Sequence, residues 1–331
     1  MTKIFMFTKL DFFLRILNKK TVSLKKNQTI VILQVSVIIP VFNATKFIKD
    51  AVQSALIQPE TAEIILIDDG STDGSYELCQ ELTQNDKIRL LTHPNHAHKR
   101  AGASRNLGIK HAQYEFIAFL DADDYFTKNR FKKAKEVFDK YPNADGTYGL
   151  LGLEYHSQKG KQIYNRHQKS ATTGFSLKKD VRPEDLFEQF LLEKSSFSIP
   201  TVILKKSSIT PDLLFDEHLF QGQDTDFKLK WILTKRLYPE NIETPVTIYR
   251  IHDNNTTHNI NEACYFLRQT YLPWINRIKS QQWSKKTNRM IVRKWLAGYG
   301  CHAPKVVRFF LKFINLFVLL IKKPWLIKYI F

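Results

Sequence analysis

Short, nearly continuous apolar runs alternate with longer segments of helical pattern through the first part of this chain. The apolar runs are 35–39, 63–67, 88–91 and 115–120. Runs of this length without polar alternation are typical of strands that are buried on both faces. The segments between them predict helices at about 45–57, 71–82 and 100–112. The sequence therefore predicts an α/β fold, with a mostly parallel sheet covered by helices on both faces.

Polar residues follow three of these apolar runs directly. They are Pro40–Asn43, Asp68–Asp73 and Asp121–Asp124. Ligands of open parallel sheets bind beyond the carboxyl ends of the strands, and these ends share one edge. We therefore expect the three polar segments to line one site.

The pattern is weaker beyond residue 145. Strands are expected at about 148–155, 199–204 and 246–251, and helices at about 182–193 and 224–233. From about residue 259 onward the chain is expected to be helical. No internal repeat and no low-complexity stretch is present in the sequence.

The net charge of +18 is concentrated at the two ends. Residues 1–34 contain seven Lys or Arg and one acid, and residues 263–331 contain fourteen Lys or Arg and no acid. The middle is therefore close to neutral. We predict three parts: a basic, apolar extension at 1–34, a globular domain at 35–257, and a helical basic region at 258–331.

The basic ends are also apolar, which favours an anionic membrane surface over nucleic acid as their partner. Phe309–Ile321 is too short to span a bilayer but suits an interfacial helix; packing of this helix on its own domain is the alternative. Residues 1–20 are too charged for a signal-peptide core. Cys79, Cys264 and Cys301 show no metal or pairing pattern and predict inert thiols. We therefore expect a cytoplasmic protein at the inner face of the membrane.

The acids after the fourth apolar run suggest metal chemistry. Asp121 and Asp123 can point into one pocket, and carboxylate oxygens suit Mg²⁺ or Mn²⁺ shared with a substrate phosphate. A polar turn is the alternative, with Asp124 as a helix-capping acid. Asp69 precedes a glycine that permits close backbone approach to a ligand, so it could bind a nucleobase or ribose. The chain lacks G-x-G-x-x-G and P-loop motifs, which disfavours dinucleotide oxidoreductases and P-loop NTPases.

Four segments together resemble the ordered motifs of glycosyltransferase family 2, which has the Rossmann-like GT-A fold. They are Val35-Ser36-Val37-Ile38-Ile39-Pro40-Val41-Phe42-Asn43, Ile67-Asp68-Asp69-Gly70-Ser71-Thr72-Asp73, Ser104-Arg105-Asn106-Leu107-Gly108-Ile109 and Phe119-Leu120-Asp121-Ala122-Asp123-Asp124. Two later segments fit the same family: Phe215–Glu217 leading to Gly222–Phe227, and Tyr249–His252. The resemblance covers roughly residues 35–255.

The resemblance implies a nucleoside-diphosphate sugar donor, for which UDP is the expected carrier. Pro40, Phe42 and Asn43 would line the nucleotide site, with Phe42 against the base. Asp69 would bind the base, and Arg105 would bind the nucleotide or the sugar phosphate.

The resemblance also implies inversion at the sugar carbon, with Mn²⁺ or Mg²⁺ as cofactor. Asp121 would contact the ribose or donor sugar, and Asp123 would bind the metal. Asp224 would be the catalytic base, with a helix N-cap as the alternative. His252 could reach the diphosphate or the metal, or it could be structural.

The expected acceptor is a lipid-linked or surface glycan. The family's Q-x-x-R-W string is absent, which indicates addition of a single sugar. The His-rich loop at 93–100 is expected to be solvated, with contact to pyrophosphate or acceptor as the alternative. A catalytically silent relative and a basic protein that binds nucleic acid or membranes are the competing hypotheses for the whole chain.

Overall fold

We obtained a computed structural model of the chain. It describes residues 33–158, 160–162, 181–192, 197–219, 221–240, 242–253, 255, 260–300 and 303–331. All of these belong to one unit, Leu33–Phe331. The predicted extension at 1–34 lies outside the described residues except for its last two positions.

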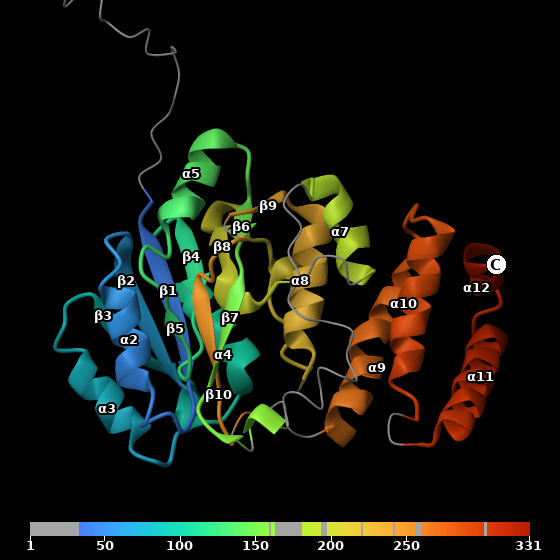
Figure 1. Ribbon diagram of the computed structural model, residues 1–331, viewed down its shortest axis with the longest axis horizontal. Coiled ribbons are helices and arrows are strands. Elements are labelled where there is room, and N and C mark those ends of the chain that lie inside the picture. Colours follow the sequence, from blue (N-terminus) through green and yellow to red (C-terminus); the bar gives the residue numbers. More distant parts are fainter. Residues whose placement is uncertain are drawn as a thin grey trace, which may run out of the picture. The chain divides into compact units, whose positions relative to one another are not determined.

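A seven-stranded sheet forms the centre of this unit, in the order β3-β2-β1-β4-β8-β6-β9 (Figure 1). Its strands are β1 (Val35–Val41), β2 (Thr61–Asp68), β3 (Ile88–Thr92), β4 (Phe116–Phe119), β6 (Gly146–Tyr148), β8 (Val202–Lys205) and β9 (Leu237–Pro239). The first four strands pair in parallel, as do β6 and β9. Only β8 runs antiparallel to its neighbours, β4 and β6. The predicted mostly parallel sheet is confirmed.

A smaller sheet contains β5 (Tyr125–Phe126), β10 (Thr247–Ile251) and β7 (Leu151–Tyr155) in that order. β10 is antiparallel to β5 and parallel to β7. Because β5 follows the Asp121–Asp124 turn at once, this pairing brings the end of β10 next to the acids after β4.

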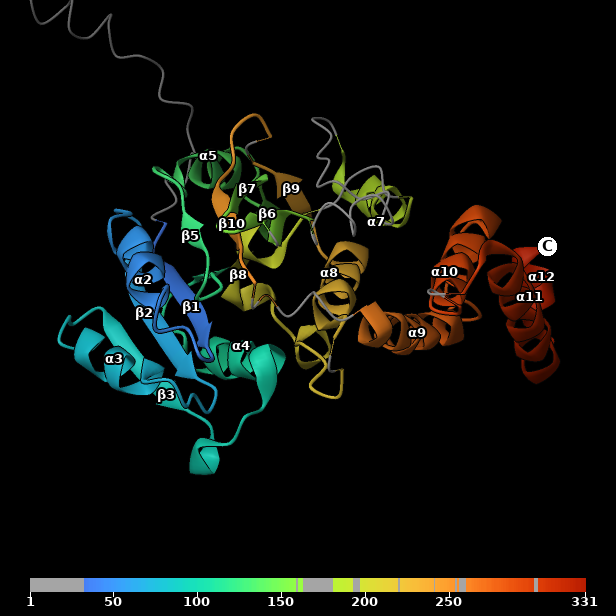
Figure 2. The same ribbon diagram turned by 60° about the horizontal axis from the view of Figure 1, so that its bottom comes forward.

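Helices flank the central sheet and continue beyond it toward the C-terminus (Figures 1 and 2). They are α2 (Ile48–Leu56), α3 (Ser75–Leu82), α4 (Arg100–His111), α5 (Lys132–Lys140), α7 (Pro183–Leu191), α8 (Gln223–Thr234), α9 (Ile260–Arg277), α10 (Lys285–Ala297), α11 (Lys305–Lys322) and α12 (Leu326–Ile330). α4 packs against β1 and β2, and α9 joins α8 to α10. The α4 contact is close because Gly108 meets Ile38 and Ile67, which leave no room for a side chain.

Pro40 stands inside the central sheet, where proline is unusual because it has no N–H to donate. β4 pairs with β1 only as far as Ile38, whose carbonyl accepts from the Leu120 N–H at 3.0 Å. Backbone groups two residues apart face the same neighbouring strand, so Pro40 faces the side from which β4 has already departed. Its missing N–H therefore costs no hydrogen bond in the sheet. β1 can for this reason contain a proline next to its last residue, Val41.

Three elements were not expected from the sequence: β5, α5 and β9. α5 has only two buried residues, Ala134 and Phe138, so its amphipathic pattern is short. The single strand expected at 148–155 is two strands, β6 and β7, in different sheets. The strand expected at 199–204 starts later, because 199–201 form a 3-10 turn before β8. The other predicted strands and helices are confirmed within a few residues at their ends.

The cysteine interpretation needs one correction. Cys79 is buried and free, as expected for an inert thiol. Cys264, however, is disulfide-bonded, so its assignment as a free thiol was wrong. No helix among the described residues is long and apolar enough to cross a membrane.

Candidate active site

The carboxyl ends of β1, β2 and β4 meet at one edge of the sheet, and the predicted site residues are found there. The structure sorts them into three groups. Arg105 holds Asp121 and Asp224, Asp123 lies beside His252, and Asp69 lies under the loop that precedes α4. Pro40, at the end of β1, is buried.

Arg105 on α4 is the centre of the first group. Its Nη2 donates to Asp121 Oδ1 at 2.6 Å, and its Nη1 donates to Asp224 Oδ1 at 2.9 Å. The arginine side chain is only 3% exposed, and its guanidinium lies 5.3 Å from the centre of the Phe215 ring. Burial lowers the pKa of Arg105, but the two carboxylates raise it by more than burial lowers it. The pKa of Arg105 is therefore shifted upward. Arg105 is therefore a permanent cation that joins two acids from distant elements.

The two acids differ in their exposure. Burial, with the charges of Asp123 and Asp224, raises the pKa of Asp121, and Arg105 opposes this rise. Asp224 lies in the first turn of α8, and its side chain is 45% exposed. Its helix starts at Gly222, which has φ of 82° and lies so close to Thr270 that no side chain would fit. The N-terminus of α8 thus presents Asp224 to solvent with one oxygen held by Arg105.

Asp123 belongs to the second group. Its Oδ2 lies 3.0 Å from His252 Nε2 and accepts from Asn255 Nδ2 at 3.3 Å. The Phe47 ring stacks on His252, with ring centres 4.7 Å apart. Asp123 and His252 are 29% and 15% exposed, so both are accessible to a small ligand. The sequence left open whether His252 faces the metal site, and the structure places it against Asp123.

This pair fits a divalent cation that a substrate also binds. A carboxylate oxygen and an imidazole nitrogen are both ligands of Mn²⁺, and such ions usually complete their shell with phosphate oxygens and water. Among the described residues, no cluster of three or more His, Cys, Asp or Glu is arranged to hold a metal ion. Protein ligands alone therefore do not form a closed metal cage in this part of the chain.

Asp124 has a structural role instead of the predicted helix-capping one. It is fully buried, and its Oδ1 accepts from the Arg250 N–H at 3.0 Å. The capping assignment was wrong because strand β5, not a helix, starts at the next residue. Burial and the neighbouring Asp123 and Asp121 raise the pKa of Asp124 well above its usual range, although Arg250 opposes this. Asp124 therefore holds the turn formed by residues Asp121–Asp124 against β10 through this hydrogen bond.

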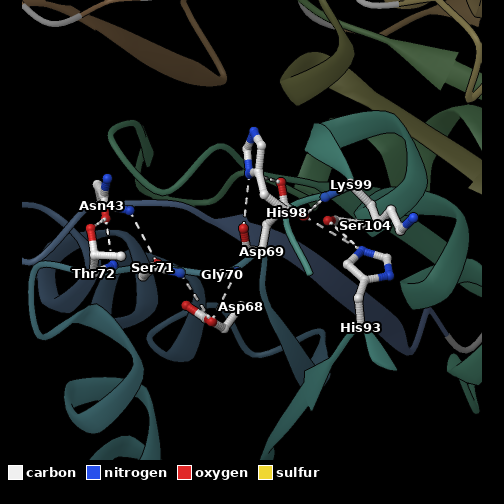
Figure 3. Close-up of polar contacts among 10 residues, drawn as sticks. All are labelled: Asn43, Asp68, Asp69, Gly70, Ser71, Thr72, His93, His98, Lys99 and Ser104. Atoms are coloured by element: carbon white, nitrogen blue, oxygen red, sulfur yellow. Dashed lines mark hydrogen bonds and ion pairs between the residues drawn. The ribbon is translucent and has the colours of Figure 1, made fainter. Parts of the chain in front are cut away.

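Asp69 forms the third group with the loop before α4 (Figure 3). The Lys99 N–H donates to its Oδ1 at 2.6 Å, and His98 Nδ1 lies 3.0 Å from its Oδ2. His93 is buried and its Nε2 lies 3.0 Å from Ser104 Oγ. The expectation of a solvated loop was therefore wrong for His93, whereas His98 is exposed as expected although its ring contacts Asp69. The abundance of histidine was the only signal in the sequence.

Asn43 connects two loops of the same edge (Figure 3). It has a positive φ of 50°, and its Oδ1 accepts from the Thr72 N–H at 2.9 Å. Its own N–H donates to Ser71 Oγ at 3.1 Å. Phe42, the preceding residue, is 47% exposed. Asn43 thus holds the β1 and β2 loops together, while the Phe42 ring remains accessible.

Comparison with known proteins agrees with this geometry. A family model of glycosyl transferase family 2 matches residues 36–197. An uncharacterized glycosyltransferase of Haemophilus influenzae is 31% identical over 194 residues, which cover 56% of this chain and 69% of that protein. The chain belongs to glycosyl transferase family 2.

Two further proteins match at lower identity. The minor teichoic acid biosynthesis protein GgaA of Bacillus subtilis is 26% identical over 213 residues, covering 61% of this chain and 44% of that protein. The crystal structure of S. aureus TarS 1-349 in complex with UDP-GlcNAc matches with a TM-score of 0.59 at 19% identity, over 81% of this chain and 73% of that one. This likeness confirms the GT-A fold.

The chain is shorter than several of its relatives. It spans 29% to 69% of the length of five curated glycosyltransferases of this family. Many of those proteins therefore contain sequence that has no counterpart here.

Replacement of Asp124 tests its structural role. In Asp124→Ala the buried Arg250 N–H loses its acceptor, so we expect the free energy of unfolding to fall by about 1–3 kcal/mol. Asp124→Asn keeps an acceptor oxygen and should lose less. Urea unfolding measures both, with exposed Asp86→Ala as the control. Equal stability of Asp124→Ala and the parent would contradict the assignment.

Proposed function

We propose that this protein transfers one sugar, with inversion, from a UDP-sugar to a hydroxyl group of a lipid-linked or surface glycan. One observation carries the proposal most directly. The buried cation Arg105 bridges Asp121 and Asp224, next to the Asp123–His252 pair. A donor site, a diphosphate site and a candidate base therefore lie along one sheet edge.

The donor would bind across the loops after β1 and β2. Phe42, whose ring is partly exposed, would stack on the base, and the Asp69 carboxylate would accept from a base N–H. Asp121, held by Arg105, would accept from hydroxyls of the ribose or the sugar. A solved neighbour of the same fold was crystallised with UDP-GlcNAc, which supports a UDP-linked hexose or N-acetylhexosamine as donor.

Asp123 would hold a divalent cation, and His252 would contact the same cation or the diphosphate. A bound cation would neutralise the negative charge that develops on the departing diphosphate. Asp123 already has the required exposure and an oxygen directed at His252. Asn255 and Phe47 fix that histidine, so the two ligands are positioned before a donor arrives.

Asp224 would act as the base. The acceptor oxygen attacks the anomeric carbon, the bond from that carbon to the diphosphate oxygen breaks, and the acceptor proton passes to the Asp224 carboxylate. Because Arg105 holds Oδ1, the second carboxylate oxygen is the one that faces the acceptor. Attack from the side opposite the leaving group inverts the sugar carbon. Arg105 orients the base and needs no contact with the substrate.

Removal of the base should slow transfer with little effect on donor binding. For Asp224→Asn we expect the rate of UDP release from a UDP-sugar, measured with acceptor, to fall on the order of 10²–10⁴-fold. UDP affinity should stay near that of the parent. Exposed Asp212→Asn, in the loop before α8, is the matched control. A rate reduced tenfold or less would remove Asp224 as base.

Loss of the metal ligand should affect activity and metal dependence together. Turnover of a panel of UDP-sugars is expected to require Mn²⁺ or Mg²⁺ and to stop with a chelator. Asp123→Asn should weaken both turnover and the binding of Mn²⁺ in the presence of UDP, because an amide is a poorer ligand than a carboxylate. Asp124→Asn, one residue along the same turn, should bind Mn²⁺ with UDP nearly as the parent does. Equal turnover by Asp123→Asn and the parent would rule out the metal assignment.

The acceptor and the membrane are linked in this proposal. A relative is named for minor teichoic acid biosynthesis, which supports an acceptor polymer of the cell surface. An enzyme that extends a lipid-linked acceptor would benefit from peripheral attachment to the membrane that holds this acceptor. We propose that α11 makes this attachment.

α11 leaves most of its apolar side chains exposed, although Leu319 is buried. Phe309, Phe313 and Phe317 follow one another at four-residue spacing and are 60–67% exposed. Its half-buried cation Lys312 faces inward, where burial and the charges of Arg308 and Arg293 lower its pKa. A contiguous exposed apolar face on a basic helix is typical of a membrane-surface helix.

The charge of the surrounding region agrees with an anionic lipid surface. From Ala263 to Phe331 there are fourteen Lys and Arg and no acids. Each basic residue near such a surface contributes about 1 kcal/mol of attraction. The apolar face and the charge therefore favour the same partner.

Liposome flotation tests the attachment. We expect the full-length chain to float with vesicles that contain phosphatidylglycerol and to stay behind with neutral vesicles. Substitution of Phe309, Phe313 and Phe317 by Ser should abolish flotation, and the exposed pair Ile57→Ser and Leu153→Ser should not. A triple variant that floats like the parent would contradict membrane attachment through α11. The same holds if the parent is a dimer in solution and the only effect of the triple substitution is to make it a monomer.

A further inference from the structure

A histidine ring lies where the proposed function places the donor base. The rings of His98 and Phe42 have centres 4.2 Å apart at an angle of 36°. His98 Nδ1 lies 3.0 Å from Asp69 Oδ2 and 2.9 Å from the Asp69 carbonyl oxygen. His98 therefore contacts both residues that are proposed to recognise the base.

Asp69 has no free oxygen for a nucleotide in this arrangement (Figure 3). Its Oδ1 accepts from the Lys99 N–H at 2.6 Å, and its Oδ2 is covered by His98. The Asp69 side chain is only 3% exposed. Rings whose centres are 4.2 Å apart are in direct contact, so no base fits between Phe42 and His98. A base can reach Asp69 from this side only after the imidazole has moved.

The imidazole offers the same two features as a nucleobase edge: a flat aromatic ring and an N–H at its rim. We infer that His98 occupies the nucleobase position as an internal substitute, and that the incoming donor displaces it. The inference rests on the proposed function, which supplies the position of the base.

The loop is built so that the side chain can leave while the backbone stays. Lys99 N–H is bonded to Asp69, and His93 is buried against Ser104 at 3.0 Å, which anchors the loop on both sides of His98. Gly70 has φ of 79° and is so close to the backbone of His96 and His98 that no side chain would fit. The His98 side chain is nevertheless 43% exposed. Rotation of its ring into solvent therefore requires no movement of the loop.

The consequence is a lowered affinity for any ligand that contains a base. A site that is open for only a fraction of the time binds more weakly by that fraction. The closed state contains one hydrogen bond, between His98 and the Asp69 carbonyl oxygen, and one ring contact with Phe42. Losing these two interactions corresponds to roughly a tenfold change in apparent affinity.

Calorimetric titration with UDP in the presence of Mn²⁺ tests the inference on the full chain. We expect His98→Ala to bind UDP about tenfold more tightly than the parent, which corresponds to about 1.4 kcal/mol. His96→Ala, which removes an exposed imidazole from the same loop, should bind like the parent. Inorganic pyrophosphate has no base, so its affinity should be the same in the parent and in both variants.

The outcomes separate this inference from the proposed function. Tighter binding of UDP but not pyrophosphate by His98→Ala, or UDP binding by that variant alone, supports displacement. UDP binding that is unchanged or weakened in His98→Ala overturns it, because His98 would then be irrelevant or a direct contact. Absence of UDP binding by the parent and by His98→Ala overturns the proposed UDP donor and the inference with it.

Discussion

The buried guanidinium of Arg105 is the interaction on which the site depends. It reaches Asp121 after β4 and Asp224 on α8, which is 119 residues away in sequence. Removal of either acid would leave a buried cation with only one partner, and loss of one member of a buried ion pair is costly. The cation therefore fixes the distance between Asp121, the proposed donor contact, and Asp224, the proposed base.

The acidic turn assigns a different partner to each carboxylate. Asp121 faces Arg105, Asp123 faces His252, and Asp124 faces the backbone of β10. Adjacent residues in a turn point in different directions, so four residues can serve a donor contact, a metal ligand and a structural anchor. The small sheet makes this possible, because pairing of β10 with β5 brings Arg250 and His252 against the turn.

The same edge shows how a ligand site can be occupied by its own protein. Asp69 is a buried carboxylate, and a buried charge needs donors. Lys99 and His98 supply them when no base is present. If this polar site binds a nucleotide as we propose, it is stable beforehand, but the nucleotide has to displace His98. α11 differs from this site. Its apolar surface is exposed, and no segment within the described part of the chain covers it.

The sequence alone determined the parallel sheet, the edge where its polar residues gather and the family motifs. These follow from local patterns: buried strands are continuously apolar, and ligand residues follow their carboxyl ends. Only the tertiary structure decided that Arg105 binds two acids, that Asp124 is an anchor rather than a cap, and that His98 lies on Asp69. Each of these depends on a partner brought near by chain folding, and no local pattern encodes such a partner.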